Sequence, residues 1–157
     1  MQQLRWVAAE QLAKKLRLKS SKSKFDIKIN NFRGKMTEED RIGLLNEIDI
    51  LKQVDHPNIV KLIDVYEDSQ TFSLVLELMT GGELFETILE KSSFSEQEAK
   101  ELILPIVDAI KYCHSLGIVH RDIKPENLLF SSKDPSVAVI KVSDFGRART
   151  IEEDQFA

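Results

Sequence analysis

Residues 118–146 read IVHRDIKPENLLFSSKDPSVAVIKVSDFG, and this stretch decides the fold and the chemistry that we expect. Asp122 and Asp144 lie 22 residues apart in it, and the segment between them contains two apolar runs, at residues 128–130 and 137–142. Short apolar runs on either side of a polar, turn-forming segment predict the two strands of a hairpin. The hairpin would bring the two carboxylates face to face.

The polar residues of this stretch match the needs of phosphoryl transfer, which depends on positioning and charge neutralisation more than on covalent chemistry. Asp122 can accept the proton of an attacking hydroxyl, and Lys124 can neutralise the transferring phosphate. Asn127 and Asp144 supply oxygen ligands of the kind that Mg²⁺ prefers. The sequence therefore predicts catalytic roles for Asp122, Lys124 and Asn127, and a metal site at Asn127 and Asp144.

The run HRDIKPEN followed by SDFG resembles the catalytic loop and the metal-binding loop of eukaryotic serine/threonine protein kinases. The run MTGGELF at residues 79–85 and the extended turn at residues 131–137 are similar to the calcium/calmodulin-dependent and myosin light chain kinase group. The resemblance implies ATP and Mg²⁺ as cofactors and a protein as substrate. It also implies that His120 is a core residue. A buried histidine that packs and hydrogen-bonds without any catalytic role gives the same expectation.

The resemblance extends upstream to residues that would hold the nucleotide. Residues 25–29 alternate between apolar and polar side chains, as a strand does, and Lys28 resembles the kinase lysine that grips the phosphates. Thr37 and Asp40 have capping-box spacing and predict a helix that runs to about residue 54. Glu47 on this helix would pair with Lys28, and the alternative is a solvated carboxylate.

Four further residues are implied to contact the nucleotide or the substrate. Glu77 and Met79 would form the hinge that meets adenine, and Leu129 would lie under the base. Glu83 would face the ribose or a basic substrate residue, and the alternative is a carboxylate satisfied by the N-terminal end of the next helix. Residues 84–91 and 95–115 are predicted to be helices, the second with a capping box at Ser95 and Glu98.

The predicted fold is α+β and protein-kinase-like, in three parts. Residues 1–24 carry seven basic residues and one acidic residue, and a basic amphipathic helical extension is expected there. Residues 25–157 form a partial protein kinase domain. Within it, residues 25–79 would make the hinge and an incomplete small lobe, which consists of an antiparallel sheet and one helix. Residues 80–157 would make the start of the helical large lobe and would end just past the DFG motif.

Composition excludes several classes of protein. The net charge of −4 suggests no nucleic-acid partner. No apolar run approaches the length of a membrane span, so no transmembrane segment is predicted. The single cysteine, Cys113, excludes an intrachain disulfide framework and fits a reducing compartment, so a cytoplasmic location is expected.

Two features favour an inactive chain. No glycine precedes Gly34, so the Gly-rich loop that covers the phosphates in kinases is expected to be missing. The kinase segments that would follow residue 157 are likewise expected to be missing. ATP binding should then be weak. The alternative is a non-catalytic, pseudokinase-type binding module or a gene remnant. The apolar positions of the helix at 95–115 cannot all be buried by the remaining residues, and self-association is expected through them: Ala99, Leu102, Ile103, Ile106, Val107 and Ile110.

Overall fold

The computed structural model describes residues 25–31, 37–67, 71–91 and 93–151. The predicted basic helix at residues 3–18 lies outside the described residues. The chain divides into two compact units. The first consists of Met1–Met36 with Leu62–Leu78, and the second consists of Thr37–Lys61 with Met79–Ala157.

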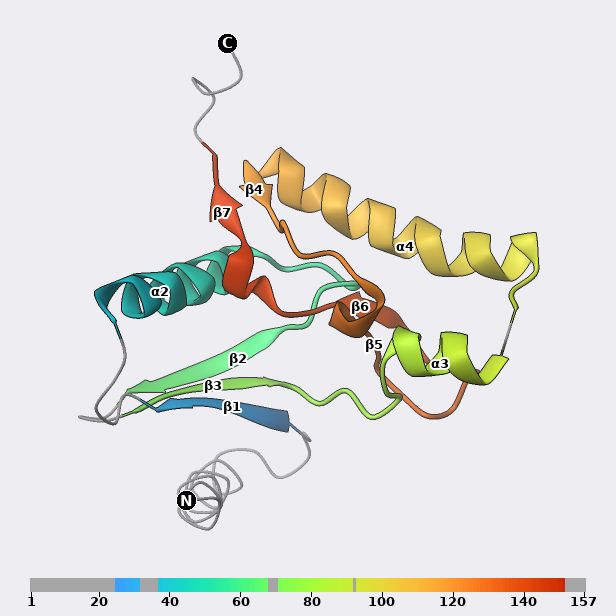
Figure 1. The fold of residues 1–157 in the computed structure, drawn as a ribbon, viewed down its shortest axis with the longest axis horizontal. Coiled ribbons are helices and arrows are strands. Elements are labelled where there is room, and N and C mark those ends of the chain that lie inside the picture. Colours follow the sequence, from blue (N-terminus) through green and yellow to red (C-terminus); the bar gives the residue numbers. More distant parts are fainter. Residues whose placement is uncertain (1–24, 32–36, 68–70, 92, 152–157) are drawn as a thin grey trace. The chain divides into compact units, whose positions relative to one another are not determined.

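The first unit is built on a three-stranded antiparallel sheet of order β1-β3-β2 (Figure 1). The strand predicted at residues 25–29 is confirmed. In the register of the sheet, Lys28 lies opposite Leu74, and Leu74 and Val75 are fully buried. The strands are β1 (Phe25–Asn31), β2 (Leu62–Glu67) and β3 (Thr71–Glu77).

Two long helices of the second unit begin where the capping boxes predict. Helix α2 (Glu38–Gln53) has Thr37 as its N-cap, and the Thr37 side chain and the Asp40 side chain each bond the other residue's backbone N–H. Ser95 and Glu98 make the same reciprocal pair at the start of α4 (Glu96–Ser115). Each pair satisfies two backbone donors that a helix start leaves without an intrahelical partner.

The predicted hairpin between the two carboxylates is present as β5 (Leu128–Phe130) and β6 (Ile140–Val142), which pair antiparallel. Strand β4 (Ile118–Val119) pairs with β7 (Arg149–Thr150). Helix α4 packs on β4 and β6, while α2 packs on the short 3₁₀ helix η2 (Phe145–Arg147) and on β7 (Figure 1). The loop that carries Asp122 therefore begins at the end of β4, within the second unit.

Helix α4 buries only part of its apolar positions, as the sequence predicts. Ile106, Ala109 and Cys113 are buried, whereas Ile103 and Val107 are 50% and 54% exposed. The helix also continues through Pro105 without ending. The buried face carries Ile106 together with Ala109 and Cys113, whose small side chains let α4 approach its neighbours closely.

Gly81 precedes α3 (Leu84–Lys91), and its backbone lies directly against β5. Its N–H donates to the carbonyl of Phe130 at 2.9 Å, and the next residue's carbonyl, that of Gly82, accepts from the Phe130 N–H, also at 2.9 Å. A Cβ at position 81 would lie 2.3 Å from the Ser132 carbonyl oxygen and 2.5 Å from the Phe130 Cβ. Only glycine permits this approach.

We expect Gly81→Ala to lower the free energy of unfolding by roughly 1–3 kcal/mol, because the methyl group must displace the β5 backbone. Gly43→Ala is the matched control. Gly43 lies inside α2 and a Cβ there meets nothing within 4 Å, so alanine should stabilise the helix by about 0.5–1 kcal/mol. Urea unfolding monitored by circular dichroism measures both, and equal effects at the two positions would contradict the close approach at Gly81.

Candidate active site

Asp122 is held in place by Asn127, the last residue of the short 3₁₀ helix η1 (Pro125–Asn127). The buried Asn127 amide donates from Nδ2 to the Asp122 carbonyl at 2.8 Å and to its Oδ2 at 2.9 Å. Both bonds use the amide nitrogen, so Oδ1 of Asn127 is the atom suited to a cation. The structure thus brings the predicted base and one predicted metal ligand into direct contact.

Two cationic side chains approach the Asp122 carboxylate. Lys124 Nζ lies 3.0 Å from Oδ2, and Arg147 Nη1 lies 3.6 Å from Oδ1. The Lys124 hydrogen bond, with a further one from Asn127, holds the pKa of the Asp122 carboxyl below its usual value. Asp122 is therefore ionised at neutral pH, which a group that accepts a proton requires.

His120 supports the site from inside the protein. Its Nδ1 accepts from the Asp122 N–H at 3.3 Å, so Nε2 is the atom that donates to the Ser143 carbonyl, at 3.0 Å. Burial lowers the pKa of His120 and favours the neutral ring that both bonds need. The ring meets Phe145 edge-on, with the ring centroids 4.7 Å apart. This is the core role that the sequence predicts for His120.

Asp144 occupies a strained turn immediately before η2. Its φ is +58°, in the left-handed region that non-glycine residues seldom adopt, and its Oδ1 accepts from the Gly146 N–H at 3.4 Å. The β5–β6 pairing and a bond of 2.9 Å from the Ser143 N–H to the Asn127 carbonyl hold this turn beside the Asp122 loop. Backbone strain of this kind is found more often at functional sites than elsewhere.

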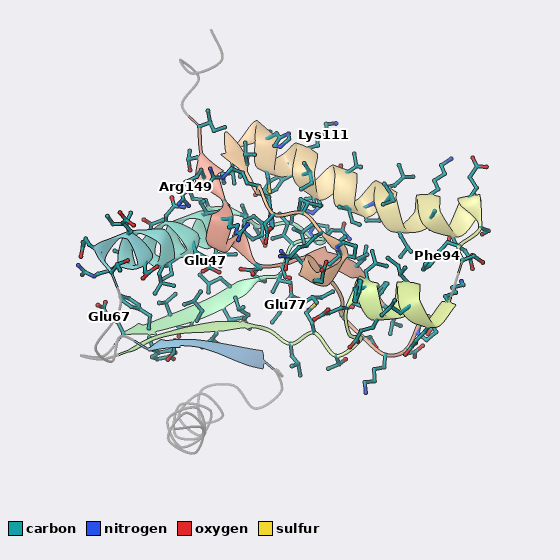
Figure 2. All side chains as sticks on the ribbon, in the orientation of Figure 1. Glu47, Glu67, Glu77, Phe94, Lys111 and Arg149 are labelled. Carbon is teal, nitrogen blue, oxygen red and sulfur yellow. The ribbon has the colours of Figure 1, made fainter. Side chains whose placement is uncertain are left out.

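Glu47 is buried on α2, on the side where η2 lies (Figure 2). A Cβ at Gly146 would be 3.7 Å from its Oε2, so the carboxylate is next to the DFG turn. The neighbouring Asn46 donates from Nδ2 to the Ala148 carbonyl at 2.9 Å. The predicted pair of Glu47 with Lys28 stays a prediction, because the Lys28 side chain lies outside the described part of the chain.

The other predicted nucleotide contacts are divided between the units. Glu77 belongs to the first unit and Met79 to the second. Glu83 and Leu129 are brought together by an antiparallel bridge between their backbones. The Glu83 carbonyl accepts from the Thr87 N–H and so begins α3, which leaves both interpretations of its carboxylate open.

Arg147 is the residue at the site that the sequence patterns missed. It directly follows the DFG motif, and Arg121 Nε donates to its carbonyl at 2.8 Å. Arg121 itself has a φ of +64°. A basic side chain next to a run of catalytic residues was the only available signal, and no spacing rule connects it to Asp122.

Comparisons with known proteins show the family of this chain. The family model described as "Protein kinase domain" matches residues 12–157. The chain is 44% identical over 133 residues to "Myosin light chain kinase A" of Dictyostelium discoideum, which covers 85% of this chain and 44% of that protein. It is 49% identical over 107 residues to "Calcium/calmodulin-dependent protein kinase type 1" of Macrobrachium nipponense, which covers 68% of this chain and 31% of that protein.

A third relative is "Calcium/calmodulin-dependent protein kinase type IV" of Mus musculus, 48% identical over 106 residues, or 68% of this chain and 22% of that protein. The chain belongs to the protein kinase domain family, and its α+β fold is that of a partial, serine/threonine-kinase-like domain. It spans less than half the length of these curated relatives.

The family match begins at residue 12, inside the segment assigned to the basic extension, and the boundary between residues 24 and 25 stays a prediction. Among the described residues, no helix is both long enough and apolar enough to cross a membrane.

Proposed function

We propose that the chain carries the phosphoryl-transfer site of a serine/threonine protein kinase. The observation that supports this most directly is the ionised Asp122 carboxylate, with Asn127 at 2.9 Å and Lys124 at 3.0 Å from its Oδ2. Asp122 accepts the proton of the acceptor hydroxyl. Lys124 is near enough to turn toward the transferring phosphate, and Asn127 holds the base in position.

The donor set fits Mg²⁺ with ATP. Asn127 Oδ1 and the Asp144 carboxylate are hard oxygen ligands. Among the residues that the structure covers, no group of three or more Asp, Glu, His or Cys side chains is arranged so that it could hold a metal ion. A site with one or two protein oxygens suits Mg²⁺, which completes its shell with water and nucleotide phosphates. The ion would neutralise the phosphate charge that develops during transfer. In the same proposal, Lys28 grips the phosphates and Glu47 pairs with Lys28. Glu77, Met79, Glu83 and Leu129 surround the nucleoside.

The 157-residue polypeptide, prepared by itself, is proposed to bind ATP weakly. No glycine precedes Gly34, and close approach of a backbone to phosphates needs glycine. We expect isothermal titration with Mg²⁺-ATP to give a dissociation constant well above the micromolar range. ATP at one hundred times the dissociation constant would stabilise the fold by about 2.7 kcal/mol, and a much smaller stabilisation is expected at millimolar ATP. Micromolar affinity would contradict this proposal.

Transfer itself is tested with ATP labelled at the γ-phosphate and a serine peptide, under conditions where the chain exceeds the peptide. The polypeptide by itself is proposed to be nearly inactive, so label should reach the serine peptide only in traces. That label should fail to reach the matched alanine peptide and should disappear when EDTA removes Mg²⁺. A non-catalytic binding module would bind peptide or nucleotide and transfer no label, and that result would replace the enzymatic proposal.

The exposed apolar strip on α4 is proposed to mediate self-association. Ile103, Leu104 and Val107 are each at least half exposed on one helix. Sedimentation velocity should show concentration-dependent oligomers, which the double variant Ile103→Gln with Val107→Gln reduces. His114→Gln, an exposed change on the same helix, should leave the oligomers unchanged. Oligomers that persist in the double variant would exclude this strip.

We place the chain in the cytoplasm with a protein as its substrate or partner. Cys113 is a free thiol buried in α4. Because burial raises the pKa of this thiol, the reactive thiolate is disfavoured and the cysteine is unreactive as a free thiol. The net charge of −4 supports a protein rather than a nucleic acid as the partner.

A further inference from the structure

We propose that Arg147 selects acceptor peptides that carry an acidic residue next to the serine or threonine. In the free chain its guanidinium covers the catalytic base, and in the complex it exchanges that contact for the carboxylate of the peptide. This inference rests on the proposed function, because it assigns the acceptor class of the same site.

The two oxygens of the Asp122 carboxylate have different neighbours. Oδ2 contacts Lys124 at 3.0 Å and Asn127 at 2.9 Å. Oδ1 faces Arg147 Nη1 at 3.6 Å. An acceptor hydroxyl must come within about 2.6–3.2 Å of the base. Since Oδ2 is already engaged twice, the hydroxyl is expected at Oδ1, where the guanidinium lies.

The main chain of Arg147 is held by hydrogen bonds at its carbonyl and at the next one, while its side chain is largely exposed. Arg121 Nε donates to the Arg147 carbonyl at 2.8 Å, and Asn46 Nδ2 donates to the carbonyl of Ala148 at 2.9 Å. The Arg147 side chain is 74% exposed, against 16% for that of Asp122. An exposed ion pair of this length is weak. The guanidinium can therefore turn from Asp122 to an arriving carboxylate without any change in the backbone.

Local charge favours an acidic acceptor. Arg147, Arg121 and Lys124 are cationic and exposed near the base. The exposed carboxylates of the same two segments are Glu126 and Asp144, and Asp144 is assigned to the metal. Arginine binds carboxylates through two parallel hydrogen bonds, which a single contact at 3.6 Å to Asp122 does not use. An acidic neighbour of the acceptor hydroxyl would thus gain a paired contact and uncover the base in one movement.

The test uses two peptides that differ only in charge beside the acceptor, Glu-Ser-Glu and Gln-Ser-Gln, in one flanking sequence. The unmodified chain should phosphorylate the glutamate peptide with a kcat/KM up to about fivefold higher, the upper end of the range expected for one exposed ion pair. Arg147→Gln should abolish this preference and phosphorylate the glutamine peptide faster than the unmodified chain does. Arg147→Lys should retain part of the preference.

Arg149→Gln is the matched control. Arg149 lies two residues away and its Nη1 donates to the Ala148 carbonyl, so its removal should leave the peptide preference intact. A preference for the glutamate peptide that survives Arg147→Gln, or transfer with no preference in the unmodified chain, overturns the inference and leaves the proposed function standing.

Binding is measured separately by fluorescence anisotropy, with the serine of each peptide replaced by alanine. Tighter binding of the glutamate peptide that depends on Arg147, without any transfer, would support the role of Arg147 and reject the proposed catalysis. Equal binding of the two alanine peptides together with no transfer would reject both.

Discussion

Asp122→Asn should reduce phosphoryl transfer by about 10²–10⁴-fold, the contribution typical of a positioned general base. The asparagine can still accept the Asn127 hydrogen bond through its side-chain oxygen, so the loop keeps its main support. What it loses is the proton acceptor and the charge that faces Lys124 and Arg147. Single-turnover transfer from labelled ATP measures the loss, and circular dichroism should show an unchanged fold.

Asp134→Asn is the control for that experiment. Asp134 also has a pKa held below its usual value, by hydrogen bonds from Ser136, and it lies in the exposed turn of the same hairpin. Its substitution removes the same charge and should leave transfer within a factor of about two, since surface changes away from special features have small effects. Equal losses at the two positions would show that charge, rather than a base at Asp122, is what matters.

Phe145→Ala should lower the free energy of unfolding by roughly 3–5 kcal/mol, because it opens a cavity at a fully buried site. Phe145 is 0% exposed, and its ring contacts that of His120. Typical domains have only about 5–15 kcal/mol of stability, so the loss is a large share of the total. For a chain of this size the thermal midpoint should fall by on the order of 10 °C.

Phe85→Ala is the control that separates the effect of burial from the effect of replacing a phenylalanine by alanine. Phe85 lies on α3 with 41% of its surface exposed, so Phe85→Ala should cost far less than the change at Phe145. Differential scanning calorimetry of both variants compares them directly. A Phe145→Ala midpoint equal to that of Phe85→Ala would mean that the DFG turn does not depend on its phenylalanine for packing.

The local parts of the fold were predictable because short-range rules determine them. Thr37 with Asp40 and Ser95 with Glu98 set the two helix starts by a hydrogen-bond exchange that spans three residues. Apolar runs on either side of a polar turn likewise predicted the β5–β6 hairpin. Each of these features depends on residues that are neighbours in sequence, so a pattern can carry them.

The parts that were missed depend on tertiary contacts. The sequence predicted that some apolar positions of α4 would stay exposed, but it could not tell which. Ile103 and Val107 are exposed because the other side of α4 meets β4 and β6. The left-handed φ values of Arg121 and Asp144 leave no trace in residue type, since glycine would be the usual indicator. Asp122 with Asn127 was predictable as a pair, whereas Arg147 reaches Asp122 only after the chain has turned back.

The hydrogen bond from Asn46 to the Ala148 carbonyl joins residues 102 positions apart in the sequence. Contacts of such high sequence separation must close a long loop before they return any free energy, and they slow folding. Helix α2 leaves the ribosome early, yet its buried side meets η2 and β7, which are synthesised more than ninety residues later. The packing of α2 is therefore a late step, and the second unit stays incomplete until the DFG turn has emerged.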